Sequence, residues 1–349
     1  MKGELGMIDL RSDTVTKPTQ EMRKAMYDAE VGDDVYGEDP TVTLLEEKAA
    51  DILGKEAALL VTSGTQGNQI AVLTHCRPGQ EIILEAESHI FYYEAGAVAA
   101  LGGVQTRTIA GVRGTMNPED VKNAIRGVDI HYPVTGMISI ENTHNRAGGA
   151  VVSVENMKEI YEIAKSHQVP VHIDGARLFN AAESAGLDVK DFAQYADTVQ
   201  FCLSKGLGAP VGSIIAGSKE FIHTARKWRK MLGGGMRQAG IIAAPGLIAL
   251  TKMTERLGED HANALKLAEG IANIKGLHVI NLVETNIIVV DVKELGVSSE
   301  EFVTHLHSEG VLAGGFGPTS VRFVTNFDVS STQIEDAVAA ISRAALKCK

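Results

Sequence analysis

The chain contains 349 residues, 44% of them hydrophobic, with 36 glycines and 9 prolines, so we expect one large domain and a smaller one. A formal net charge of −11 argues against nucleic acid or an anionic membrane as the main partner. Three scattered cysteines without a CxxC pair, and the lack of an apolar leader or a bilayer-length stretch, predict a cytoplasmic protein with neither a disulfide framework nor a zinc site.

The first 53 residues are predicted to form a short polar segment, a helix, an acidic loop and a second helix. Pro18 opens the first helix, because proline is favoured in a first turn. The acidic loop at 31–40 carries Tyr36, which is either a packing anchor or a site residue. Apolar residues then recur at helical spacing from Thr43 to Leu53.

A short apolar strand at 57–61 is followed by a turn of small residues and a helical run to His75. The free N–H groups and the dipole of a helix start favour anions, and Ser63 and Thr65 add hydroxyl donors. The turn matches neither the GxxxxGK[ST] loop nor the GxGxxG fingerprint. An ordinary strand–helix turn therefore remains the alternative to a phosphate site.

Further short apolar strands are predicted at 82–84, 137–140, 169–174 and 198–203, with helices between several of them. One such helix begins after the capping residue Ser153. Alternating strands and helices are typical of a mainly parallel sheet that is covered on both faces. The predicted fold class is therefore α/β.

The pattern changes after a basic, glycine-rich stretch at 226–237. A helical run from 241 to 272 leads into short strands, one of which carries Arg322, and into helices opened by capping boxes at Ser298 and Ser330. We therefore expect an N-terminal segment that contributes to the site, a large cofactor-binding domain and a small α+β domain, at 1–17, 18–254 and 255–349.

Two strand ends carry residues with useful chemistry. The strand at 198–203 is followed by Lys205, and a strand 31 residues earlier ends in Asp174. A solvated lysine and an aspartate that caps a helix are the simpler alternatives. However, α/β sheets bind ligands at strand ends, and a partly desolvated lysine there can attack a carbonyl to form a Schiff base.

Pyridoxal phosphate (PLP) requires this combination of groups. A lysine holds its aldehyde, a carboxylate keeps its pyridine nitrogen protonated, and a helix start takes its phosphate. His89 follows another predicted strand, where its imidazole could stack on a flat ring. The set therefore predicts a PLP site formed by Lys205, Asp174, His89 and the turn at Ser63–Thr65.

The sequence also resembles the threonine aldolases, members of the aspartate-aminotransferase-like (fold type I) family of PLP enzymes. The resemblance implies a large domain with a mainly parallel seven-stranded sheet and a small α+β C-terminal domain. It extends over nearly the whole chain, from about Met7, and is carried by motifs at residues 9–16, 32–37, 141–145, 172–177, 204–207 and 233–238.

The resemblance also implies a role for each matching residue. Lys205 would be the Schiff-base lysine, Asp174 would face the pyridine nitrogen, and His89 would stack on the ring. Cofactor-binding residues would include Ser63, Gly64, Thr65 and Arg177 and, from a neighbouring subunit, Lys230 and Arg237. Substrate-binding residues would be Ser12, Tyr36, Tyr93, His131, Arg177 and Arg322.

The implied reaction is cleavage of L-threonine or L-allo-threonine to glycine and acetaldehyde through a Lys205 Schiff base and a quinonoid intermediate. His89, His131 or a water between them would be the base. Shared sites imply a homo-oligomer, a dimer or a tetramer, with the tetramer favoured. Two alternatives remain: another fold type I activity, such as an aminotransferase or a β-eliminating lyase, and a non-catalytic module that binds a nucleotide phosphate.

Overall fold

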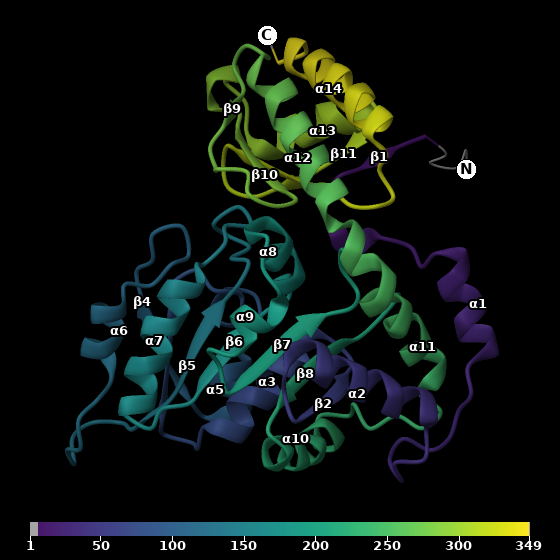
Figure 1. Cartoon of the computed structure of the whole chain (residues 1–349). Helices are drawn as coiled ribbons and strands as arrows, with labels where there is room; N and C mark the ends of the chain where they lie inside the picture. Colours follow the sequence, from purple (N-terminus) through teal and green to yellow (C-terminus); the bar gives the residue numbers. More distant parts are fainter. Residues whose placement is uncertain (1–5, 349) are drawn as a thin grey trace.

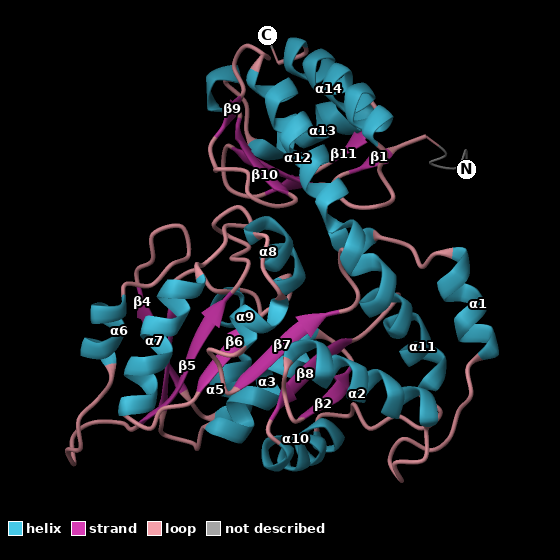
Figure 2. Cartoon of the chain, viewed as in Figure 1, coloured by secondary structure: helices cyan, strands magenta, loops and turns pink. Residues whose placement is uncertain are grey.

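The structure is a computed structural model that describes residues 6–348, so the first five residues of the predicted N-terminal segment lie outside it. Within these residues the large sheet has seven strands, and helices cover both of its faces (Figures 1 and 2). Their order across the sheet is β2 (Ala57–Val61), β8 (Ser213–Gly217), β7 (Thr198–Cys202), β6 (Val171–Asp174), β5 (Thr135–Glu141), β3 (Glu81–Glu85) and β4 (Gln105–Ile109).

Strand β8 runs antiparallel to both of its neighbours, and the other adjacent pairs are parallel. Because two reversals cancel, β2 points the same way as β7. The ends of β2, β5, β6 and β7 therefore meet at one edge of the sheet.

Alternate side chains of the central strands enter two separate cores, which explains why apolar residues occur on both faces of these strands. In β3, for example, Ile83 belongs to one core, whereas Ile82 and Leu84 belong to the other. The core around Ile83 is covered by α1 (Gln20–Asp28), α2 (Pro40–Leu53), α6 (Pro118–Ala124), α7 (Val154–Ser166), α8 (Leu178–Ala185), α9 (Val189–Ala193) and α11 (Gly240–Ile248). The other core is covered by α3 (Gly64–His75), α4 (His89–Tyr92), α5 (Ala97–Gly102) and α10 (Lys219–Met231).

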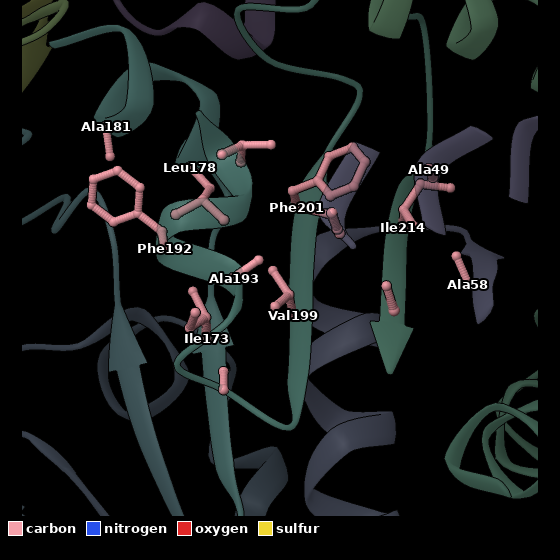
Figure 3. Close-up of a cluster of buried hydrophobic side chains, with 14 of the residues drawn as sticks. Ala49, Ala58, Ile173, Leu178, Ala181, Phe192, Ala193, Val199, Phe201 and Ile214 are labelled. Atoms are coloured by element: carbon pink, nitrogen blue, oxygen red, sulfur yellow. The ribbon is translucent and has the colours of Figure 1, made fainter. Parts of the chain in front are cut away.

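Figure 3 shows how the first of these cores packs against β6, which ends in Asp174, and β7, which precedes Lys205. Phe201 of β7 and Phe192 of α9 are almost fully buried. The ring of Phe201 meets that of Phe179 edge-on, with centroids 5.1 Å apart. Burying one such side chain stabilises the fold by about 1.5–3 kcal/mol, so this packing holds β6 and β7 in register.

The C-terminal part of the chain packs as a second, smaller unit. Its antiparallel sheet has the order β12 (Gly314–Gly315), β13 (Ser320–Val324), β10 (Ile287–Asp291) and β9 (His278–Val279). Its core is completed by α12 (Leu257–Ala272), α13 (Ser299–Ser308) and α14 (Ser331–Leu346). The predicted α/β fold with a mainly parallel seven-stranded sheet and a small α+β part is confirmed.

The N-terminal segment joins this small unit although it lies far away in sequence. Strand β1 (Ile8–Asp9) pairs in parallel with β11 (Val311–Leu312), beside which Figure 1 shows it. Ile8 and Leu10 are buried in the core of the small unit. The predicted division near residue 255 stays a prediction, since α12 begins at Leu257 in the large core and reaches the small core by Ala264.

One local prediction was wrong. Helix α1 begins after the capping residue Thr19, so Pro18 lies just outside it. The helical run expected from 241 to 272 is present, and within it the α-helical pattern changes to a π turn at Ala249–Met253 and a 3₁₀ turn at Thr254–Arg256. No helix within residues 6–348 is long and apolar enough to cross a membrane.

Candidate active site

A cavity of about 360 Å³ lies at the sheet edge where β5, β6 and β7 end. Its wall combines residues of the large unit, the N-terminal segment and the small unit. They are Ser12, Thr14, His89, Tyr93, Glu141, Thr143, Asn145, Asp174, Ala176, Arg177, Lys205, Gly315, Phe316 and Arg322. A larger hollow of about 710 Å³ beside α2 contains Tyr36 but neither Lys205 nor Asp174, so the smaller cavity is the candidate active site.

Lys205 and Asp174 have different surroundings in this cavity. The amine of the half-buried Lys205 makes no hydrogen bond or ion pair within residues 6–348. Asp174 is buried, and its carboxylate accepts hydrogen bonds from the Asn68 amide at 2.9 Å and from the Ala176 N–H at 3.2 Å. Asp174 does not cap a helix, because α8 begins after Arg177. The lysine is free to react, whereas the carboxylate is held in place.

His89 is the first residue of α4, and its Nδ1 lies 2.9 Å from the carboxylate of Glu94. Burial disfavours the charged imidazole, but the hydrogen bond to Glu94 and the charges of Asp174 and Glu141 outweigh it, so the pKa of His89 is raised. His89, Glu94 and Asp174 each offer an atom within 4.8 Å of the others. Such spacing also suits a metal ion, but hydrogen bonds within the protein already account for the two carboxylates.

Arg177 makes a bidentate ion pair with Asp13, with distances of 2.6 and 2.7 Å, and both side chains are buried. Burial alone would raise the pKa of Asp13, but the charge and hydrogen bonds of Arg177 and the charge of Lys205 bring it below its usual range. The N-terminal segment therefore supplies a carboxylate that orients Arg177.

Arg322 enters the cavity from β13 of the small unit. Its Nη1 donates to Asn145 Oδ1 at 2.9 Å, whereas its Nε is buried without a hydrogen-bond partner. Burial, and then the charge of Arg177, lower the pKa of Arg322. Two guanidinium groups that face one cavity repel each other unless an anion lies between them, so this part of the cavity suits a carboxylate.

Glu141, at the end of β5, holds these groups together. Its carboxylate accepts hydrogen bonds from the backbone N–H groups of His89 and Asn145. It thus links the loop that carries His89 to the side chain that holds Arg322. Burial raises the pKa of Glu141, although the charge of His144 opposes this effect.

The turn at Ser63–Thr65 opens α3 at the same edge of the sheet, with Ser63 as its capping residue. A Cβ atom on Gly64 would lie only 2.9 Å from Cys202 Sγ, so the turn packs closely against the end of β7. Ser63 and Thr65 are exposed, and the turn does not line the 360 Å³ cavity itself. It offers an anion site beside that cavity.

Four predicted site residues lie outside the cavity of their own chain. Tyr36 lines the other hollow, and His131 is exposed with its Nδ1 2.7 Å from Asp129. Lys230 is exposed in the last turn of α10, and Arg237 pairs with Asp33 at 3.0 Å. The remaining predicted residues line the cavity or, for Ser63, Gly64 and Thr65, lie at the same sheet edge.

Asp13, Asn68, Glu94 and Glu141 were not singled out from the sequence. All four are buried and polar, and each forms a hydrogen bond with a predicted site residue. A carboxylate at the end of a largely apolar segment, such as Glu141 after Met137-Ile138-Ser139-Ile140, is a usable signal because buried polar groups need partners.

These groups fit pyridoxal phosphate. A free amine, a buried carboxylate, a partly buried imidazole, a helix start and an unpartnered guanidinium nitrogen meet at one sheet edge. They match the aldehyde, the pyridine nitrogen, the ring, the phosphate and the carboxylate of an amino-acid substrate. The fold agrees: a solved threonine aldolase from Leishmania major superposes with a TM-score of 0.83 at 19% identity, covering 97% of this chain and 99% of that one. Fold and site define a PLP-dependent enzyme of fold type I.

Sequence comparison gives a narrower grouping. A probable low-specificity L-threonine aldolase of Arabidopsis thaliana is 48% identical over 334 residues, 94% of each chain. The low specificity L-threonine aldolase of Escherichia coli is 44% identical, over 95% of this chain and 98% of that one. The sequence profile of the β-eliminating lyases matches residues 9–295. The chain belongs to the β-eliminating lyase family, and it is a PLP-dependent lyase.

Proposed function

We propose that this protein is a low-specificity L-threonine aldolase, which cleaves L-threonine or L-allo-threonine to glycine and acetaldehyde. The observation that carries the proposal is the shared cavity of Lys205, Asp174, Arg177 and Arg322. The aldolases of Arabidopsis and E. coli, at 48% and 44% identity, support the same substrate.

Each residue has a separate task in this proposal. Lys205 would hold the cofactor aldehyde, Asp174 would keep the proton on the pyridine nitrogen, and the turn at Ser63–Thr65 would take the phosphate. When bound, PLP supplies an electron sink for the pair released as the Cα–Cβ bond breaks. Ser12, Arg177 and Arg322 would grip the substrate carboxylate and orient that bond.

A base must remove the proton of the β-hydroxyl group. His89 borders the cavity, and because its Nδ1 is bonded to Glu94, its Nε2 is the atom available for proton transfer. His131 is the other candidate, either directly or through a water that both imidazoles share. Tyr93, which also borders the cavity, would contact the substrate side chain.

We further propose that the protein acts in the cytoplasm as a homo-oligomer, with a tetramer favoured. Lys230 and Arg237 would reach the cofactor phosphate of a neighbouring subunit. Tyr36 and His131 are also exposed and lie outside the cavity of their own chain. They would therefore contact the substrate in the active site of a neighbouring subunit. Each active site would then be complete only in the assembly.

Product analysis tests the proposal. The PLP-loaded protein is incubated with L-threonine and, separately, with L-allo-threonine, and glycine and acetaldehyde are measured together. We expect equal amounts of both products, and none from Lys205→Ala. Formation of 2-oxobutanoate and ammonia without glycine would instead identify a β-eliminating lyase. Transfer of the amino group to a keto acid would identify an aminotransferase.

A further inference from the structure

Glu94 is a carboxylate that the proposed reaction does not use, although it lies beside the cavity. Glu94 is only 2% exposed, and no lysine or arginine of residues 6–348 forms an ion pair with it. Three donors surround it instead: His89 Nδ1 at 2.9 Å, Asn68 Nδ2 at 2.8 Å and Gln69 Nε2 at 2.6 Å. A buried carboxylate is costly unless such donors hold it, so this position is built to keep a negative charge behind His89.

Asn68, on α3, connects Glu94 to the cofactor-facing carboxylate. Its amide nitrogen lies 2.8 Å from Glu94 and 2.9 Å from Asp174. Because ionised carboxylates only accept hydrogen bonds, this amide nitrogen gives one N–H to each of them. The orientation of the Asn68 side chain is therefore determined, and its oxygen must face a donor.

His172 supplies that donor. Its Nε2 lies 3.1 Å from the Asn68 oxygen, and its Nδ1 lies 3.0 Å from the Thr198 hydroxyl. Burial lowers the pKa of His172 to about 3, so the ring is neutral and carries one proton. Donation from Nε2 leaves Nδ1 to accept from Thr198. Every hydrogen bond from Thr198 to Glu94 thus has a defined direction.

We propose that Glu94 is the positioning residue that holds the His89 imidazole, and that Asn68 locks Glu94 to Asp174. The two groups that face the cofactor then belong to one buried hydrogen-bonded unit that exists before the cofactor binds. The link to PLP rests on the proposed function, whereas the unit itself can be measured without the cofactor.

The unit also sets the charge of His89. The ionisable groups that face this imidazole are Glu94 from its own loop, Asp174 from β6 and Glu141 from β5, with the Tyr93 ring centroid 5.6 Å away. All three carboxylates favour the protonated ring. Of these carboxylates, only Glu94 makes a hydrogen bond to the His89 imidazole. Removing the charge of Glu94 should therefore have the largest effect on the pKa of His89.

The experiment follows the imidazole signal of His89 by NMR in the cofactor-free protein, assigned by its loss in His89→Asn. In Glu94→Gln, which keeps the shape but removes the charge, we expect the pKa of His89 to fall by about one unit or more. The PLP dissociation constant should rise about tenfold, as expected for losing a hydrogen bond to a charged group. Glu155→Gln, the same change on the exposed face of α7, should alter neither quantity.

An unchanged His89 pKa in a folded Glu94→Gln protein would overturn the proposal, even if the melting temperature fell, because a purely structural role would not move the titration. If Glu94→Gln does not fold, Glu94→Asp keeps the charge but withdraws it by one methylene. It should weaken PLP binding severalfold, and unchanged binding would again overturn the proposal. The titration does not depend on turnover, so failure of the threonine assay leaves this test intact.

Discussion

At the scale of single residues, the cavity is defined by charges that are either matched or left unmatched. Asp174 and Arg177 have partners within the chain, which hold them in one position. Lys205 and the Nε of Arg322 have none within residues 6–348. An unmatched cation in a cavity is costly in the empty protein and becomes favourable when an anion or a carbonyl group arrives. In the proposed function, substrate and cofactor would supply the missing partners.

Replacing Arg322 by alanine tests this view. We expect the KM for threonine to rise at least about thirtyfold, because losing one partner of a desolvated ion pair costs on the order of 2 kcal/mol or more. Steady-state kinetics measure the KM, and a PLP titration should show almost unchanged cofactor affinity. Arg343→Ala, which removes a surface pair with Glu309, is the control. A normal KM in Arg322→Ala would show that the substrate carboxylate binds elsewhere.

At the scale of elements, the loop after β5 is tied to the end of β3. His144 is 1% exposed, and its Nε2 lies 2.9 Å from a Glu85 oxygen. Burial opposes the charged imidazole, but Glu141, Glu85 and Glu87 outweigh it and raise the pKa of His144. The same loop carries Asn145, which holds Arg322. The ion pair therefore supports, from a distance, the arginine that we propose to bind the substrate carboxylate.

His144→Gln should lower the free energy of unfolding by about 3 kcal/mol at pH 6, because it leaves Glu85 buried without its cation. Because the pKa of His144 is raised in the folded state, its protonated imidazole stabilises the fold fully when the pH is below the unfolded-state pKa of about 6.5. This stabilisation is lost as the pH rises through the folded-state pKa. The difference in unfolding free energy between the unmodified protein and His144→Gln should thus shrink toward pH 9. Urea unfolding at both pH values measures it.

His278→Gln provides the matched control for this prediction. Its imidazole is 2.7 Å from Glu294, but both side chains are exposed, and such surface pairs contribute about 0–1 kcal/mol. A difference for His144→Gln that stayed constant from pH 6 to pH 9 would contradict the assigned charge of His144.

At the scale of the whole molecule, several apolar and site residues face outward in the single chain. Val128 and Ile130, which precede His131 in its loop, are almost fully exposed. Tyr36 is also exposed, as are Lys230 and Arg237. Apolar side chains at such positions are typical of surfaces that another protein chain covers. These exposed residues support the proposed assembly with shared sites.

Subunit exchange tests whether sites are shared. Arg237→Ala should bind PLP more weakly, and mixing it with Lys205→Ala should restore part of the activity, because a hybrid can assemble one intact site. Activity after exchange, with hybrids verified by mass spectrometry, is the measurement. A mixture of Arg322→Ala and Lys205→Ala is the control, since these two residues share one cavity and no intact site can form. Equal results for the two mixtures would mean that Arg237 acts within its own chain.

Most of the helices and strands can be predicted from the sequence, because their signals are local. Apolar runs marked β2, β3, β5, β6 and β7, and capping residues marked the starts of α7, α13 and α14. The places of Asp174 and Lys205 can be predicted as well, since strand ends follow directly from the ends of those runs. Strand β4 (Gln105–Ile109) was not predicted, because it lies at the edge of the sheet and its residues are mostly polar.

The partners of these residues cannot be predicted from the sequence, because they depend on tertiary packing. Asp13 and Arg177 are 164 positions apart, and Asn68 and Asp174 are 106 apart, so no local pattern connects them. The reversal of β8 depends on the short connection after Leu203, which has no room for a crossover helix. His131 lies outside its own cavity because its exposed loop precedes the start of β5, whereas the cavity lies where β5 ends. Contacts between distant segments are set by how the elements pack, and packing acts on the whole chain at once.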